Sequence, residues 1–179
     1  MNLLRIYLLF VYLSTYINLY LNLPLHTALT INTLSMLIIT SSIPIMGYCS
    51  DKIGRKPMLL FGAIGIGLLA YPLFLILEIK TFAAITTVQL IFALLIACCY
   101  GVTPALLAEM FATPTRYSAI ALPYNIANVL FGSTAPLVAT LLIHFRHSLA
   151  APSFYLIFAA FIMLIIVINI PETYRKVLQ

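Results

Sequence analysis

Charged side chains are scarce in this sequence of 179 residues: Asp, Glu, Lys and Arg together supply only 7% of it. In soluble domains roughly a quarter of the residues are charged. Hydrophobic residues make up 64% of this chain. The composition excludes a soluble globular domain and predicts an integral membrane protein surrounded by the lipid bilayer.

Clusters that could carry catalysis or bind a metal are also lacking. Cys49, Cys98 and Cys99 fall in or at the edges of apolar segments without metal-ligand spacing, and we interpret them as reduced, apolar side chains. The three histidines have no Glu or Cys at ligand spacing. The sequence has no nucleophile–base pattern, and its nine basic residues are too scattered to form a nucleic-acid-binding stripe. We therefore expect no enzyme, no metal or cofactor, and no nucleic-acid partner.

Long apolar runs are what the sequence has in abundance. A helix needs about 20 apolar residues to cross the hydrocarbon core of a bilayer, and lipid leaves the backbone no hydrogen-bonding partner outside the helix. Six runs are long enough, over approximately residues 6–23, 30–50, 57–77, 81–108, 117–143 and 153–170. The prediction is an all-α membrane protein whose residues 1–179 form one domain of six transmembrane helices.

Basic residues are distributed unequally between the two sides of such a six-span chain. Two of them, Lys80 and Arg146, fall on the side away from the termini. The other seven share the side of the termini: Arg5, Lys52, Arg55, Lys56, Arg116, Arg175 and Lys176. Because cytoplasmic loops carry the excess of Lys and Arg, the sequence predicts that both termini are cytoplasmic.

The stretch GYCSDKIGRKP, residues 47–57, concentrates charge between the second and third runs. Glycines permit a tight turn and close helix approach, and Asp51 can accept hydrogen bonds from a helix N-terminus or an arginine. The stretch fits the pattern G-x-x-x-D-[RK]-x-G-R-[RK], which resembles the signature loop of the major facilitator superfamily of secondary transporters. The matching residues are Gly47, Asp51, Lys52, Gly54, Arg55 and Lys56.

A second resemblance narrows the family. Residues 108–118 (AEMFATPTRYS), residues 122–126 (LPYNI) and Phe131-Gly132 are similar to the region of the fourth and fifth helices in the C-terminal half of metabolite:proton symporters. The whole chain, from the tyrosine-rich first run to Pro171-Glu172-Thr173, most resembles the last six helices of the proline/betaine branch. Such a transporter has twelve helices in two halves. The resemblance therefore implies one half of a twelve-helix bundle in the bacterial inner (plasma) membrane.

The resemblance also implies a role for the charges at the ends of the helices. Asp51, Arg55 and Lys56, together with Glu109 and Arg116 at the next cytoplasmic turn, are similar to a network that latches helix ends in one transport state and releases them in another. An ion pair such as Arg55 with Glu109 could bias that equilibrium by a few kcal/mol at most. The alternative is that these residues only determine the membrane topology and belong to a loop exposed to water.

Polar residues of the fifth run mark a candidate substrate cavity. Ser118, Asn125, Asn128 and Gly132 share one helical face. Asparagine is too polar to face lipid, so this face should point into the bundle. It either lines a cavity or forms hydrogen bonds and close packing between helices.

Tyrosines offer a second set of candidates for the cavity. Tyr12, Tyr16 and Tyr20 recur every four residues in the first run, and Tyr100 lies in the fourth. If the substrate is a quaternary ammonium osmolyte such as betaine, aromatic faces would attract its cation. The alternative is an interfacial belt of tyrosines.

No Asp, Glu, Lys or Arg is expected well inside any run. A proton-coupled symporter needs a titratable group within the membrane, so the resemblance implies that proton coupling, and recognition of a substrate carboxylate, belong to the N-terminal half.

Three functional hypotheses remain open from the sequence. The first is a half-transporter for symport of protons with a small osmolyte or organic acid, such as proline or betaine, by alternating access. It would pair with a separately encoded N-terminal half or with itself. The second is an inactive remnant of a split transporter gene. The third is a non-transporting membrane scaffold or channel subunit.

Overall fold

The computed structural model describes residues 2–21, 23–111 and 116–170. Within these ranges all regular structure is helical, and six helices are long and apolar enough to cross a membrane. This confirms the predicted all-α, six-span architecture. The elements are α1 (Asn2–Ile6), η1 (Tyr7–Tyr12), α2 (Leu13–Leu21), α3 (Leu25–Ile53), α4 (Arg55–Leu77), α5 (Phe82–Met110), α6 (Arg116–Ala127), η2 (Asn128–Gly132), α7 (Ala135–Arg146) and α8 (Pro152–Asn169), where η marks a π-helical turn.

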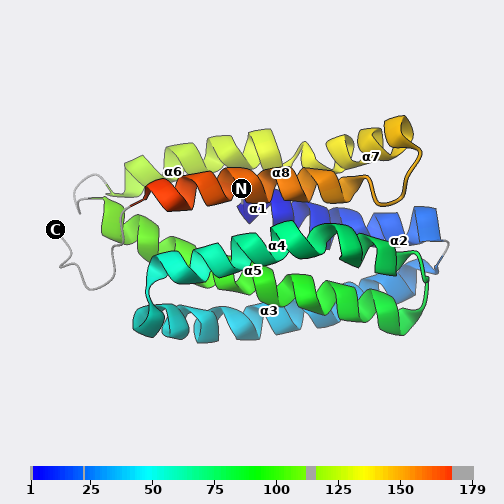
Figure 1. Ribbon diagram of the computed structural model, residues 1–179, viewed down its shortest axis with the longest axis horizontal. Coiled ribbons are helices and arrows are strands. Elements are labelled where there is room, and N and C mark those ends of the chain that lie inside the picture. The colour runs from blue at the N-terminus through cyan, green and yellow to red at the C-terminus, as the bar shows by residue number, and fades with distance from the viewer. Residues whose placement is uncertain (1, 22, 112–115, 171–179) are drawn as a thin grey trace.

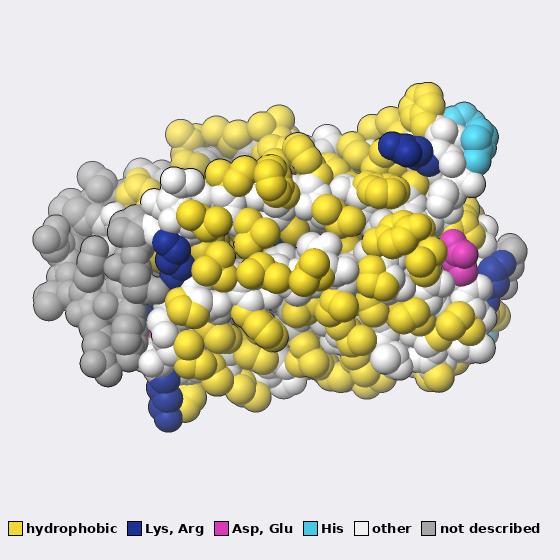
Figure 2. Space-filling view, in the orientation of Figure 1, with side chains coloured by type: hydrophobic (Ala, Val, Ile, Leu, Met, Phe, Trp, Pro, Cys, Tyr) yellow, Lys and Arg dark blue, Asp and Glu magenta, His cyan; other side chains and the backbone are white. Residues whose placement is uncertain are grey.

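The six spans lie side by side along the long axis of the molecule (Figure 1). Helix α5 packs against both α3 and α4, and α4 packs in turn against α8. On the face shown in Figure 2, hydrophobic side chains cover the middle of the molecule, and the visible Lys, Arg, Asp and Glu side chains lie toward its two ends. This distribution suits a bundle whose middle is embedded in hydrocarbon.

One end of the bundle holds the turn between α3 and α4, and we call it the signature-loop end. Helix α3 ends at Ile53 and α4 begins at Arg55, so Gly54 alone makes the connection. Its backbone has φ 116° and ψ 156°, a region that is essentially restricted to glycine. Gly54 therefore permits the reversal that brings the charges of both helix ends together.

Other glycines allow helices to approach closely. A Cβ atom on Gly101 of α5 would lie 2.7 Å from the carbonyl oxygen of Ile43 and 2.9 Å from the backbone nitrogen of Gly47, both in α3. A Cβ on Gly62 of α4 would lie 2.5 Å from the Cys99 sulfur atom of α5. The backbones of α3, α4 and α5 are thus closer than any side chain at these positions would allow.

The two π-helical turns lie against each other. A Cβ on Gly132 of η2 would come within 3.1 Å of the ring of Tyr7 in η1. Helix α1 also packs on η2, and α7 packs on η1. The first and fifth spans are therefore irregular at the place where they meet.

Candidate functional site

Arg55, the first residue of α4, lies at the centre of a charged cluster at the signature-loop end. Its guanidinium pairs with Asp51 of α3 at 2.5 Å and with Glu109 of α5 at 2.9 Å. A further bond of 2.6 Å runs from Arg55 to the Ser50 hydroxyl. The Arg55 and Glu109 side chains are only 11% and 16% exposed, so this pair is shielded from water while Asp51 is not. Arg55 thereby joins the ends of three helices.

The other predicted members of this cluster reach different partners. The Lys56 ammonium donates to the carbonyl oxygens of Ile168 and Ile170 at 2.7 and 3.2 Å, which satisfies acceptors left open at the C-terminal end of α8. The Lys52 ammonium lies 4.5 Å from the centre of the Tyr48 ring. Arg116 begins α6, but its side chain lies outside the described part of the chain, as do residues 171–179.

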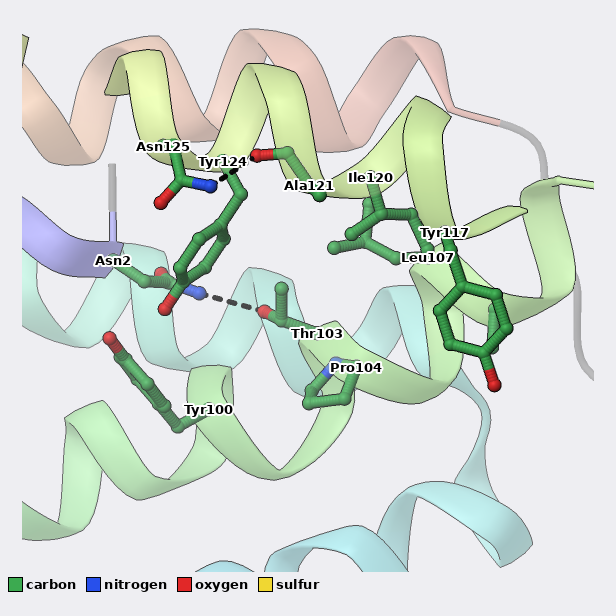
Figure 3. Close-up of a pocket in the computed structure, with 11 residues that line it drawn as sticks. Asn2, Tyr100, Thr103, Pro104, Leu107, Tyr117, Ile120, Ala121, Tyr124 and Asn125 are labelled. Carbon is green, nitrogen blue, oxygen red and sulfur yellow. Dashed lines mark hydrogen bonds between the residues drawn. The ribbon is translucent and has the colours of Figure 1, made fainter. Parts of the chain in front are cut away.

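A cleft of about 720 Å³ opens between α5 and α6, and Asn2 of α1 also lines it (Figure 3). The rings of Tyr100 and Tyr124 come from opposite walls and point toward Asn2. The Asn2 amide donates to the Thr103 hydroxyl at 2.7 Å, whereas its Oδ1 atom is buried without a partner. The lining consists of Asn2, Tyr100, Thr103, Pro104, Leu107, Ala108, Tyr117, Ile120, Ala121, Tyr124 and Asn125.

Two of the predicted cavity residues, Tyr100 and Asn125, line this cleft. Ser118 is exposed on α6 without lining it, and Asn128 lies in η2 with its Oδ1 atom buried and unpartnered.

Tyr12 and Tyr16 do not line the cleft either, because both are buried in the core. The rings of Tyr16 and Phe74 pack edge to face with their centres 6.0 Å apart. The Tyr16 hydroxyl donates to the carbonyl oxygen of Leu149 at 2.9 Å. The four-residue spacing of Tyr12, Tyr16 and Tyr20 thus produces a row of neighbouring rings that are tilted relative to one another.

Sequence reasoning did not single out Asn2, Thr103, Tyr117 or Tyr124 as cavity residues. A spacing signal exists for two of them, since Tyr117 and Tyr124 are seven residues apart and share a helical face.

The position of Arg5 differs from the one expected from the sequence. It was expected at a membrane end, with no charge inside a span, but its side chain is 0% exposed within α1. Its guanidinium donates to the Met163 sulfur at 3.0 Å, the Ala159 carbonyl oxygen at 3.4 Å and the Cys99 sulfur at 3.6 Å. The physical reason is that α1 begins at Asn2 beside Thr103, seven residues before the end of α5, so Arg5 lies within the bundle. Without Arg5, the side of the termini keeps six basic residues against two.

The sequence analysis also missed a buried amide. Gln89 of α5 is fully buried; its side chain donates to the Asn32 side-chain oxygen at 3.1 Å and to the Leu9 carbonyl oxygen at 3.4 Å. Leu9 belongs to η1, so Gln89 supplies a donor to the irregular part of the first span and links it to α3 and α5.

Comparison with known families gives the same superfamily as the resemblance of residues 47–57 to its signature loop. The family profile described as Major Facilitator Superfamily matches residues 1–178. The chain belongs to this superfamily. Within the superfamily it is 34% identical to the proline/betaine transporter of Escherichia coli (strain K12), over 76% of this chain and 27% of that protein.

Two further facilitators are similar to a comparable extent. The proline/betaine transporter of Salmonella typhimurium is 35% identical, and the glycine betaine/proline/ectoine/pipecolic acid transporter of Dickeya dadantii is 34% identical, each over 76% of this chain and 27% of the relative. The chain thus matches about a quarter of the length of these relatives. No solved structure matches it.

Proposed function

We propose that this chain is one half of a secondary active transporter that carries a small zwitterionic osmolyte, such as proline or betaine, in symport with protons. Membership in the Major Facilitator Superfamily and the similarity to proline/betaine transporters support transport of an osmolyte. Six spans suit one half of a twelve-helix transporter. A separately encoded N-terminal half, or a second copy of this chain, would complete it in the bacterial inner membrane.

The observation that carries the proposal is the bridge that Arg55 makes between Asp51 and Glu109. It joins α3, α4 and α5 through side chains that must separate if these helix ends move apart. A shielded ion pair loses much stabilisation when one partner is withdrawn. It can therefore favour the state in which the signature-loop end is closed, as alternating access requires.

The same proposal assigns proton coupling to the other half. In the described ranges, the acidic residues Asp51, Glu78 and Glu109 all lie near helix ends. None of them is placed to carry a proton through the middle of the membrane. The orientation that follows from the basic residues puts the signature-loop end in the cytoplasm.

Uptake of labelled betaine and proline tests the proposal. Transport-deficient cells would express this chain alone, a six-span N-terminal half alone, or both. We expect uptake only with both chains, and we expect an uncoupler to abolish it. The variant Glu109→Gln should reduce this uptake severalfold, because it removes the charge that Arg55 binds, whereas Glu78→Gln at the opposite end should not.

Absence of uptake from cells that carry both chains in the membrane would contradict the proposal and favour an inactive remnant or a non-transporting subunit. Uptake by this chain alone would contradict the assignment of proton coupling to the other half.

A further inference from the structure

We propose that a pocket at the end of the bundle opposite the signature loop binds a divalent transition-metal ion, such as Zn²⁺ or Cu²⁺, through His144 and His147. The pocket has a volume of about 500 Å³ and lies between the ends of α2 and α7. Figure 2 shows histidine side chains on the surface at this end. The site is separate from the cleft between α5 and α6, and it does not depend on the proposed transport function.

The two histidines come from the last turn of α7 and the residue that follows it. The centres of their rings are 6.3 Å apart. An imidazole nitrogen binds Zn²⁺ at about 2.1 Å, and the ring centre lies roughly 1 Å farther away, so two histidines on one ion have ring centres roughly 5–6.5 Å apart. The rings therefore already have a separation that a shared ion allows. Both side chains are exposed, so they can rotate toward the ion.

His147 also has an uncommon backbone conformation. It ends α7 with φ 49° and ψ 32°, in the left-handed region, which few residues other than glycine adopt. Glycine is the usual residue at such a helix end. Histidine at this position accepts some backbone strain and in return supplies a side chain that can bind a metal, as is typical of functional positions.

The surroundings of the pair favour a transition metal over Mg²⁺ or Ca²⁺. Among the described residues that line the pocket, none is acidic, so the carboxylate ligands of Mg²⁺ and Ca²⁺ are lacking. Neutral imidazole suits Zn²⁺, Cu²⁺ and Ni²⁺ instead. Arg146 lies between the two histidines in the sequence, but its guanidinium carbon lies over the Phe154 ring, 5.6 Å from the ring centre. That contact holds the positive charge against α8.

Water completes the coordination of the ion. In the described ranges no group of three or more His, Cys, Asp and Glu is arranged to hold a metal, so the two histidines are the protein ligands. The hydroxyl groups of Tyr20, Thr140 and Ser148 line the same pocket and can accept hydrogen bonds from water on the ion. We expected no metal site from the sequence because the histidines lack a Glu or Cys at ligand spacing; a pair of histidines with water makes a weaker site than such a set.

Calorimetric titration of the purified full chain with Zn²⁺ tests the site. The chain would carry no polyhistidine tag and would be held in nanodiscs of phosphatidylcholine, so that neither a tag nor an anionic lipid binds the metal. We expect one Zn²⁺ per chain. Cu²⁺ should bind more tightly than Zn²⁺, as the general order of affinities requires, and Mg²⁺ should not bind.

Variants locate the metal within the chain. His144→Asn and His147→Asn should each weaken Zn²⁺ binding about tenfold or more, because each removes one of the two protein ligands. His26→Asn is the matched control, since His26 is another exposed histidine, near the start of α3. Cys49→Ser removes the half-buried thiol. Both of these variants should bind Zn²⁺ as the parent chain does.

Three results would overturn the inference. Zn²⁺ binding that is unchanged in both His144→Asn and His147→Asn would place the metal elsewhere, at a thiol if Cys49→Ser abolishes it. Equal binding of Mg²⁺ and Zn²⁺ would show attraction of cations without coordination by imidazole. Absence of Zn²⁺ binding to the parent chain, even at millimolar concentration, would show that the two rings hold no ion.

Discussion

Arg5 buries its guanidinium among two sulfur atoms and one carbonyl oxygen of α5 and α8. Sulfur is a weak acceptor, and the Arg5 Nε atom is buried without any partner. Removing a charge from water without pairing it costs several kcal/mol. We therefore expect the buried Arg5 guanidinium to lower the stability of the bundle.

Substituting Arg5 by an apolar side chain of similar length should stabilise the protein. For Arg5→Met we expect the free energy of unfolding to rise by about 1–4 kcal/mol, as found when buried ionic groups are replaced by well-packed apolar ones. Thermal unfolding of the purified chain in detergent measures the change. Arg146→Met, at the end of α7, is the control and should have little effect. A lower unfolding temperature for Arg5→Met would show that Arg5 contributes to folding.

Gly54 has a backbone conformation that no other residue adopts easily, with φ 116° and ψ 156°. We expect Gly54→Ala to lower the free energy of unfolding by about 1–3 kcal/mol, the usual cost of such strain. A thermal unfolding curve unchanged from that of the parent chain would mean that the turn between α3 and α4 can be made in another way.

At the scale of elements, the crossing of α3 and α5 sets the geometry of the signature-loop end. The crossing point is Gly101 against Gly47, and Asp51 and Glu109 lie one and two turns beyond it on their helices. The two acidic side chains are brought within reach of Arg55 because the helix backbones approach so closely. This explains in physical terms why the loop pattern includes Gly47 together with the charges.

A methyl group at the crossing should therefore separate the helices. We expect Gly101→Ala to destabilise the chain by about 1–3 kcal/mol, as overpacking does, because its Cβ would meet backbone atoms that cannot rotate away. Gly67→Ala is the control, since its Cβ would lie at an ordinary contact distance of 3.5 Å from the Ala160 Cβ atom. Thermal unfolding of both variants measures the difference, and equal effects would show that the crossing is not tight.

The ion pair between Arg55 and Glu109 can be isolated by a double-mutant cycle. Comparing Arg55→Ala, Glu109→Ala and the double variant should give a coupling energy of about 0.5–3 kcal/mol, because the two side chains are in contact and largely shielded from water. The free energy of unfolding is again the quantity measured. Additive effects of the two substitutions would show that this pair does not hold the helix ends together.

At the scale of the whole molecule, the apolar middle and the charged ends define how the bundle lies in a membrane. Alkaline phosphatase is active only outside the cytoplasm, so fusions to it report orientation. Fusions after residues 80 and 148 should be active and fusions after residues 56 and 110 inactive, because the positive-inside rule places the signature-loop end in the cytoplasm. The opposite pattern would reverse the proposed orientation.

The sequence by itself determined the class of the protein, its six spans and its superfamily. Apolar runs about 20 residues long have few alternatives to transmembrane helices in lipid, and the pattern of residues 47–56 is local enough to be recognised without a structure. Asp51 and Arg55 are four residues apart on either side of the turn at Gly54, so the sequence also suggested that they could pair.

Only the tertiary structure decided which helix faces meet. It placed Glu109 beside Arg55, buried Tyr12 and Tyr16 in the core while Tyr100 and Tyr124 line a cleft, and enclosed Arg5 among α5 and α8. The physical reason is that every face of these helices is largely apolar, because lipid and protein interior accept the same side chains. Hydrophobic periodicity therefore cannot tell the two apart, and the close approach of backbones at glycines decides the packing.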